Sequence, residues 1–218
     1  MNKPKNPKFY AKADKKDKTL YLYGNVMEEE ATDWLTGEKI EAITPKGVRA
    51  LVEELNLNPQ DTLKIHLNSY GGSVFAAVAI YNYLKELQNE KEIIIDGVAA
   101  SGASVIAMAG DKIYMGKGAL LMVHQASTFC FGNASEMEKV VQTLKKIDNS
   151  IIDIYMSHFS GTKEQLTEML ENETWLDPKE AKEKGFCHQE VSEKTEKVTD
   201  SEIEHAKNLI HAFARLAV

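Results

Sequence analysis

Ser101 and His124 are the residues of this chain whose types and positions best suit nucleophilic catalysis. Ser101 follows the apolar segment 92–96 and a run of small residues, and a helical pattern begins directly after it. A serine at such a strand-to-helix turn exposes its hydroxyl and leaves neighbouring backbone N–H groups able to face an oxyanion. His124 ends another apolar segment, so both side chains are expected at the edge of a sheet. The pair predicts acyl transfer to serine, with histidine as the base.

A second small-residue element, Asn68-Ser69-Tyr70-Gly71-Gly72, follows the predicted strand 63–67 and precedes another helical pattern. A Gly-Gly turn at a helix N-terminus points backbone donors outward, as an oxyanion hole requires. Because the two turns end successive strands of one βαβ unit, they should be neighbours at one edge of the sheet. Ligands of open α/β sheets bind at that edge.

The elements that must position these residues alternate between strand and helix patterns. Predicted strands cover residues 20–23, 63–67, 93–95, 112–115 and 119–123, and Thr44-Pro45, Ser73 and Ser104 begin helices. Alternation at this spacing predicts a largely parallel, covered sheet with right-handed crossovers. Ser135-Glu136-Met137-Glu138 predicts a capping box that opens a long amphipathic helix over residues 135–159, long enough to protrude from a compact head.

Composition and charge predict one soluble domain with distinct ends. The chain has 218 residues, of which 43% are hydrophobic and 27% charged, and its net charge is −7. Residues 1–18 carry seven lysines and two aspartates and therefore predict a basic, flexible arm. Few aromatic residues interleave with these lysines, so no nucleic-acid partner is expected. Residues 19–191 form the predicted domain, and residues 192–218 a polar linker and a C-terminal amphipathic helix, Ser201 to Leu216.

Several functional classes find no support in the sequence. Cys130 and Cys187 are the only cysteines and lack CxxC spacing, which argues against a disulfide framework or a zinc site and for a reducing, cytoplasmic location. No stretch reaches the roughly 18 apolar residues of a membrane span. Neither GxxxxGK[ST] nor HExxH occurs, so we expect no cofactor, no metal and no ATP hydrolysis by this subunit.

Three motifs taken in order carry a resemblance to a known family. Asn68-Ser-x-Gly-Gly, Ala99-Ala-Ser101 and Met122-x-His124-Gln resemble the proteolytic subunit of Clp protease (ClpP), a self-compartmentalising serine peptidase. The likeness continues in Trp175-Leu-Asp-Pro-Lys-Glu-Ala and spans roughly residues 20–190. It implies an α/β ClpP/crotonase-like fold of repeated βαβ units, with a protruding handle helix that interlocks two rings. A homo-oligomeric ring or double ring acting on polypeptide substrates is the expected assembly.

The resemblance also implies a set of site residues. Ser101 would be the nucleophile and His124 its base, and the backbone N–H groups of Gly72 and Gly102 would form the oxyanion hole. Alignment of the Trp175 motif puts Glu173 where the family's usual aspartate falls, so that its carboxylate would orient the imidazole.

Two neighbouring residues compete with Glu173 for this role. Asn172 and Asp177 are close enough in sequence to replace it, and a surface position for Glu173 is the plain alternative.

The chain departs from the housekeeping ClpP pattern in ways that are similar to ClpP-type proteases of phages and prophages. Tyr70 replaces the usual proline, and Glu173-Thr174-Trp175 surrounds the third catalytic position. This likeness implies a role in phage head maturation, by cleavage of capsid or scaffold proteins. The basic arm does not match the apolar entrance loops of housekeeping ClpP, which argues against docking to a Clp-type ATPase.

Other functions compete with the peptidase interpretation. A crotonase-fold acyl-CoA enzyme shares the paired backbone oxyanion hole but has no Ser–His pair, and the Met-x-His-Gln element speaks against it. A non-catalytic ring or capsid-assembly component is the other alternative, which the presence of both Ser101 and His124 disfavours. Cys130 lies near His124 in sequence, but it lacks a turn of small residues and is expected to be a plain thiol.

Overall fold

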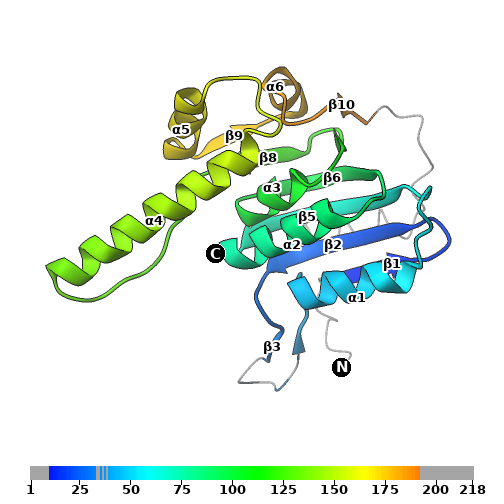
Figure 1. The fold of residues 1–218 in the computed structure, drawn as a ribbon, viewed down its shortest axis with the longest axis horizontal. Helices are drawn as coiled ribbons and strands as arrows, with labels where there is room; N and C mark the ends of the chain where they lie inside the picture. Colours follow the sequence, from blue (N-terminus) through cyan, green and yellow to red (C-terminus); the bar gives the residue numbers. More distant parts are fainter. Residues whose placement is uncertain (1–9, 33–34, 36, 38, 192–218) are drawn as a thin grey trace, which may run out of the picture.

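The computed structural model describes residues 10–32, 35, 37 and 39–191, and an eight-stranded sheet forms the centre of this part of the chain (Figure 1). Hydrogen-bonded neighbours follow the order β1-β2-β5-β6-β7-β10, and β8 pairs with both β6 and β9. The strands of the sheet are β1 (Tyr10–Asp14), β2 (Thr19–Val26), β5 (Leu63–Gly72), β6 (Lys91–Ala100), β7 (Lys112–Met115), β8 (Leu120–Val123), β9 (Thr174–Leu176) and β10 (Gln189–Glu190). A separate small hairpin pairs β3 (Ala31–Thr32) with β4 (Lys39–Ile40).

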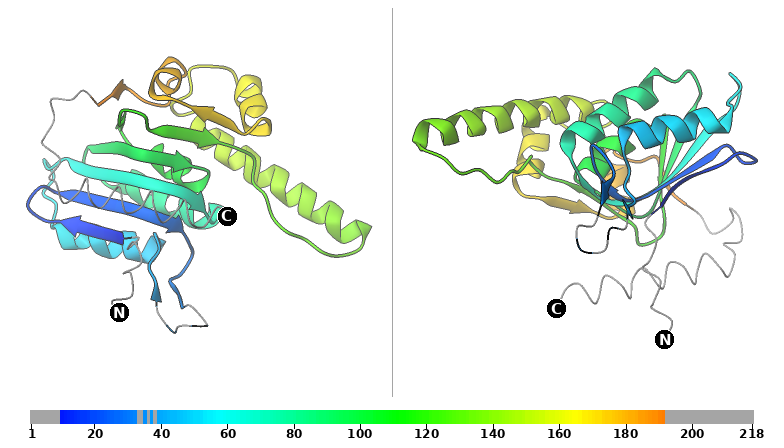
Figure 2. Two further views of the ribbon diagram at one scale, coloured as in Figure 1. Left: turned by 180° about the vertical axis from the view of Figure 1, so that it is seen from behind. Right: turned by 90° about the horizontal axis from the view of Figure 1, so that it is seen from below.

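Helices α1 and α2 cover one face of the sheet, and α3 packs on β5 and β6 beside α2 (Figure 2). The helices are α1 (Pro45–Leu55), α2 (Val74–Glu86), α3 (Gly102–Ala107), α4 (Ala134–Tyr155), α5 (Lys163–Glu171) and α6 (Pro178–Glu183). Thr44 caps α1 by accepting a hydrogen bond from the Gly47 amide, which confirms the predicted Thr-Pro start. The core lies between these helices and the sheet and is built from apolar side chains such as Leu67, Ile80 and Ile95, all fully buried.

The α/β fold predicted from the sequence is confirmed, because the central strands β2, β5, β6 and β7 pair in parallel. The strands carrying the glycine and serine elements are longer than predicted, however. β5 continues to Gly72 because Asn25 and Val26 of β2 pair with Gly71 and Gly72 beyond a register shift. β6 similarly continues to Ala100. Its first half, up to Ile95, pairs with β7, and its last residues, from Val98, pair with β8. The small residues are therefore strand ends rather than turns.

The N-terminal part also differs from the prediction. Residues 10–14, placed by sequence in the flexible arm, form β1 and pair antiparallel with β2. The alternation of Ala11 and Ala13, both packed against the core, with the charged residues Lys12 and Asp14 gives this segment a strand period. Residues 1–9 lie outside the described residues, as do the predicted linker and C-terminal helix.

The long helix α4 extends away from the sheet, as predicted (Figure 1). Its cap is two residues earlier than expected, because Asn133 accepts from the Glu136 amide while the Glu136 carboxylate accepts from the Asn133 amide. Asn and Ser are similarly good caps, so the sequence pattern alone did not separate them. Among the described residues, no helix has the length and apolar character needed to cross a membrane.

Candidate active site

Strand register brings the two predicted reactive residues together. β6 and β8 run in parallel with Ala100 opposite Met122, so Ser101 is one residue past its ladder and His124 two residues past. Strand β5 lies on the other side of β6, with Ser69 opposite Ala99. Because all three strands end at this edge, the serine, the histidine and the glycines converge there, as the sequence predicted.

The Ser101 hydroxyl oxygen lies 2.8 Å from Nε2 of His124. Both residues are half-buried. Ser101 has φ 54° and ψ −126°, a conformation that a non-glycine residue adopts at an energetic cost. Its backbone N–H donates to the Met122 carbonyl at 3.1 Å, which holds the strained residue against β8. A hydroxyl held against an imidazole in this way can pass its proton to Nε2 as it attacks a carbonyl.

The backbone at Gly71 and Gly72 lies close to the backbone at Ser101 and Gly102. A Cβ placed on Gly71 would lie 2.7 Å from the Gly102 amide nitrogen, and one on Gly72 would lie 2.1 Å from the Val26 carbonyl oxygen. Gly71 and Gly72 have φ of +90° and +141°, which L side chains rarely adopt. The amide nitrogen of Gly72 is 3.6 Å from the position of a Cβ on Gly102. Only glycine permits this approach, and it brings the two predicted oxyanion donors, Gly72 and Gly102, to one spot.

A cavity of about 260 Å³ adjoins the serine–histidine pair. Its lining includes the segment Gly72-Ser73-Val74 and, shortly after His124, the residues Ala126 and Ser127. Val105 from α3 and Ile151 and Tyr155 from α4, all buried, also line it. Two segments, one before α2 and one after β8, therefore flank the serine–histidine pair.

Glu173 lies near the pair but does not contact it. In the antiparallel β8–β9 ladder Val123 is opposite Thr174, so Glu173 falls opposite His124 one step beyond the ladder. Its exposed carboxylate accepts a hydrogen bond from Nε1 of Trp175 at 3.4 Å, and among the described residues it has no hydrogen bond to His124.

The two competing residues serve the ends of helices. Asp177 caps α6 and accepts from the Glu180 amide at 2.8 Å. Asn172 is the C-cap of α5. Neither side chain forms a hydrogen bond or ion pair with His124 within the described part of the chain.

The remaining described histidines have other partners. His66 lies 2.9 Å from the Asp96 carboxylate, His158 Nε2 lies 3.0 Å from the Met108 carbonyl oxygen, and His188 Nδ1 accepts from the Ile113 amide at 3.0 Å. Burial lowers the pKa of His158. His205 and His211 are outside the described residues. Cys130 is an exposed thiol and Cys187 a buried one, and neither is in a disulfide.

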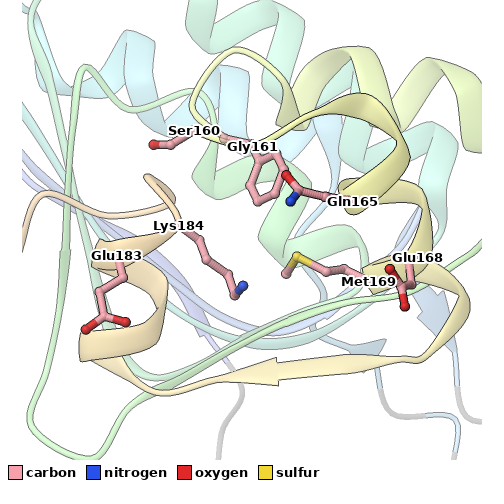
Figure 3. Close-up of a pocket in the computed structure, with 8 residues that line it drawn as sticks. Ser160, Gly161, Gln165, Glu168, Met169, Glu183 and Lys184 are labelled. Carbon is pink, nitrogen blue, oxygen red and sulfur yellow. The ribbon is translucent and has the colours of Figure 1, made fainter.

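A larger cavity, of about 390 Å³, lies elsewhere in the molecule (Figure 3). The turn from Phe159 to Gly161 lines it together with side chains of α5 and α6, and Lys184 and Met169 extend toward each other across it. It contains a serine, Ser160, but no histidine is among its lining residues.

Two residues of the site region escaped the sequence analysis. The carboxylate of Asp148, on α4, accepts from the Ala126 amide at 2.7 Å and so fixes the segment after His124. Tyr155, also on α4, reaches the cavity and the residues beneath Ser101. Both residues lie on α4, whose amphipathic sequence pattern indicated only packing. No motif in the neighbouring sequence predicts a role for either residue at the site.

An α/β fold with a serine–histidine pair at the carboxyl edge of its parallel strands has the architecture of a serine hydrolase. Comparison with known proteins narrows this class. The family model of Clp protease matches residues 15–195 of this chain. The chain belongs to the Clp protease family, and it is accordingly a hydrolase of the serine peptidase class.

Curated relatives agree with this assignment. The ATP-dependent Clp protease proteolytic subunit of Deinococcus radiodurans is 31% identical over 144 residues, which cover 64% of this chain and 69% of the relative. The subunit of the same name from Bacteroides fragilis is 29% identical over 164 residues, covering 72% and 78%. ATP-dependent Clp protease proteolytic subunit 3 of Streptomyces avermitilis is 28% identical over 172 residues, covering 75% and 78%. These matches do not favour the acyl-CoA enzyme or the non-catalytic component considered above.

Proposed function

We propose that this chain is an endopeptidase that cleaves polypeptides through Ser101, His124 and Glu173. The observation that carries the proposal is the 2.8 Å approach of the Ser101 hydroxyl to His124 Nε2 beside a cavity. An extended substrate would lie between Gly72-Ser73-Val74 and the segment after His124.

The proposed reaction has two halves. Ser101 Oγ bonds to the peptide carbonyl carbon while its proton moves to His124, and the carbonyl electron pair becomes an oxyanion held by the Gly72 and Gly102 amides. The C–N bond then breaks, and the leaving amine takes the proton from His124. Water, deprotonated by His124, hydrolyses the acyl-enzyme and restores the serine.

Glu173 is the proposed third member because of where the β8–β9 register puts it. Val123 and Thr174 are the last pair of the ladder, so His124 and Glu173 are the next residues on the two strands, and a side-chain rotation away from Trp175 would turn the carboxylate toward the imidazole. Such a carboxylate would fix the tautomer that leaves Nε2 able to accept the serine proton.

We also propose that the chain works as a homo-oligomeric ring or double ring. The protruding helix α4 supports this proposal, since it offers exposed apolar side chains at Met137 and Val141.

A role in phage head maturation is supported by Tyr70 and Glu173, where the chain departs from the housekeeping pattern. Portal and major-capsid genes beside the coding sequence would agree with that role, and their absence would count against it.

A fluorophosphonate probe tests the proposed nucleophile. Such a probe forms an O–P bond with an activated serine and releases fluoride, so wild-type protein should be labelled and Ser101→Ala should not. Ser160→Ala and Cys130→Ala are matched controls that should remain labelled, because Ser160 lies in the other cavity and Cys130 is an exposed loop thiol. Persistent labelling of Ser101→Ala would reject Ser101, and loss of labelling only in Cys130→Ala would assign the reaction to the cysteine.

A further inference from the structure

Two buried hydroxyl groups meet directly beneath the proposed nucleophile. The Ser104 side chain, in α3, and the Tyr155 side chain, in α4, are 0% and 1% exposed, and their oxygens lie 2.8 Å apart. Ser104 Oγ also lies 2.6 Å from the Ser101 carbonyl oxygen and 2.8 Å from the Met122 carbonyl oxygen. A single buried hydroxyl thus touches the peptide of the nucleophile, the strand of the base and a third helix.

The direction of these hydrogen bonds follows from the available protons. Carbonyl oxygens only accept, so the one proton of Ser104 must go to the Ser101 or the Met122 carbonyl. The Tyr155 hydroxyl, which has no other partner in the described structure, therefore donates to Ser104 Oγ. Burial raises the pKa of Tyr155, which keeps its hydroxyl protonated as a donor. Tyr155 therefore donates a hydrogen bond to Ser104, and Ser104 donates one to the Ser101 or the Met122 carbonyl oxygen.

The Ser101 carbonyl matters because of what shares its peptide plane. The trans peptide that joins Ser101 to Gly102 carries the carbonyl oxygen on one side and the Gly102 N–H on the other. Holding the oxygen inward, against Ser104, consequently points the Gly102 N–H away from Ser104. The Met122 carbonyl, which accepts from the Ser101 amide, links the same hydroxyl to β8 and His124.

We infer that Ser104 and Tyr155 are positioning residues for the peptidase reaction, which together set the direction of the Gly102 N–H and the alignment of Ser101 with His124. The inference rests on the proposed function, since it concerns groups that act only if Ser101 is the nucleophile. Neither hydroxyl touches the reacting atoms. Alanine at position 104 would suffice for the helix, because the Ser101 carbonyl already accepts hydrogen bonds from the Ser104 and Val105 amides. The extra hydroxyl is therefore explained by orientation rather than by helix formation.

The test removes each hydroxyl with the least change of shape, in Tyr155→Phe and Ser104→Ala, separately and together. On a fluorogenic peptide we expect kcat to fall about tenfold to a hundredfold with KM changed less than about twofold, because the Gly102 N–H and the Ser101–His124 pair lose their alignment while the substrate cleft is kept. The rate of fluorophosphonate labelling should fall in parallel. Because the two hydroxyls act in series, the double variant should lose little more than either single one.

Tyr83→Phe, on the half-buried tyrosine of α2, is the matched control and should leave kcat unchanged. Thermal unfolding and sedimentation of every variant show whether fold and assembly persist, and rates are expressed per folded active protein. Unchanged kcat in both single variants, or a loss no greater than the loss of folded protein, would overturn the inference. In that case wild-type labelling and its loss in Ser101→Ala would leave the proposed function standing. Labelling that persists in Ser101→Ala would instead reject the proposed function itself.

Discussion

At the scale of single residues, the proposed nucleophile and its proposed base are in contact, while the proposed acid is not in contact with that base. Ser101 Oγ and His124 Nε2 are at hydrogen-bonding distance, whereas Glu173 faces Trp175. Glu173 also has a backbone φ of 46°, a conformation that residues other than glycine seldom adopt. Because its side chain is held by one long hydrogen bond, the proposed acid role requires only that the Glu173 carboxylate turn from Trp175 toward the His124 imidazole.

The role of Glu173 is testable by changing only its charge. Glu173→Gln should lower turnover by up to about 10⁴-fold, because the imidazole loses the partner that fixes its tautomer and stabilises its charged form. Glu173→Asp should keep appreciable activity, since it restores the carboxylate usual in the family. Peptide hydrolysis measured under saturating substrate checks both.

Asp177→Asn is the matched control for Glu173→Gln. It removes a carboxylate four residues away, and asparagine can still cap α6, so turnover should be nearly unchanged. If Asp177→Asn were inactive and Glu173→Gln active, the acid would be Asp177. Two active variants would indicate a Ser–His dyad.

At the scale of elements, the ends of β5 and β6 decide the geometry of the site. Gly71 and Gly72 extend β5 alongside β2 while turning the backbone through conformations that L side chains avoid. The strand therefore brings the Gly72 amide beside Gly102. The chain then enters α2, which Ser73 caps by accepting from the Ala76 amide.

Gly72→Ala should disturb both the fold and the site. An added Cβ would lie 2.1 Å from the Val26 carbonyl oxygen, so β2 and β5 must separate locally. We expect a loss of unfolding free energy well above the roughly 1–2 kcal/mol that an unfavourable φ alone costs, together with a loss of peptidase activity. Urea denaturation measures the first effect.

Gly118→Ala separates strain from collision. Gly118 has φ +76°, but a Cβ there meets no atom within 4 Å, so only the conformational cost applies. Equal losses of stability in the two variants would contradict the proposed clash at Gly72.

At the scale of the whole molecule, α4 and the loop before it form an arm that leaves the compact part (Figure 2). Phe129 and Phe131, in that loop, are 93% and 94% exposed. Aromatic side chains bury about 150–250 Å² each when covered, so such exposure in a single chain supports the proposed homo-oligomer.

Sedimentation at micromolar concentration should therefore show a species of several subunits. Phe129→Ser combined with Phe131→Ser should shift it toward smaller species, because the apolar area that favours association is removed. Thr128→Ala, in the same loop, removes no aromatic area and should sediment as wild type. A strictly monomeric wild-type protein with full activity would contradict the assembly.

Much of this architecture was predictable because its causes are local in sequence. The apolar period of residues 63–67 and 93–95, the Thr44-Pro45 start of α1 and the serine between a strand and a helix all depend on near neighbours. The Ser101 and His124 motifs were informative for the same reason. Prediction failed where a local pattern had rivals, as at Asn133 and Ser135, or where distant pairing extended a strand, as at β1 and the end of β5.

The tertiary structure alone decided which distant groups meet. Whether β6 passes from β7 to β8, and so brings His124 to Ser101, depends on strand pairing that no local pattern encodes. The same holds for Glu173 opposite His124 and for the Tyr155 hydroxyl beneath the Ser101 peptide, 51 residues along the chain from Ser104. Local patterns report the conformations that nearby residues prefer, whereas these contacts arise from the packing of whole elements. The sequence therefore identified the candidate reactive residues, and the fold determined what aligns them.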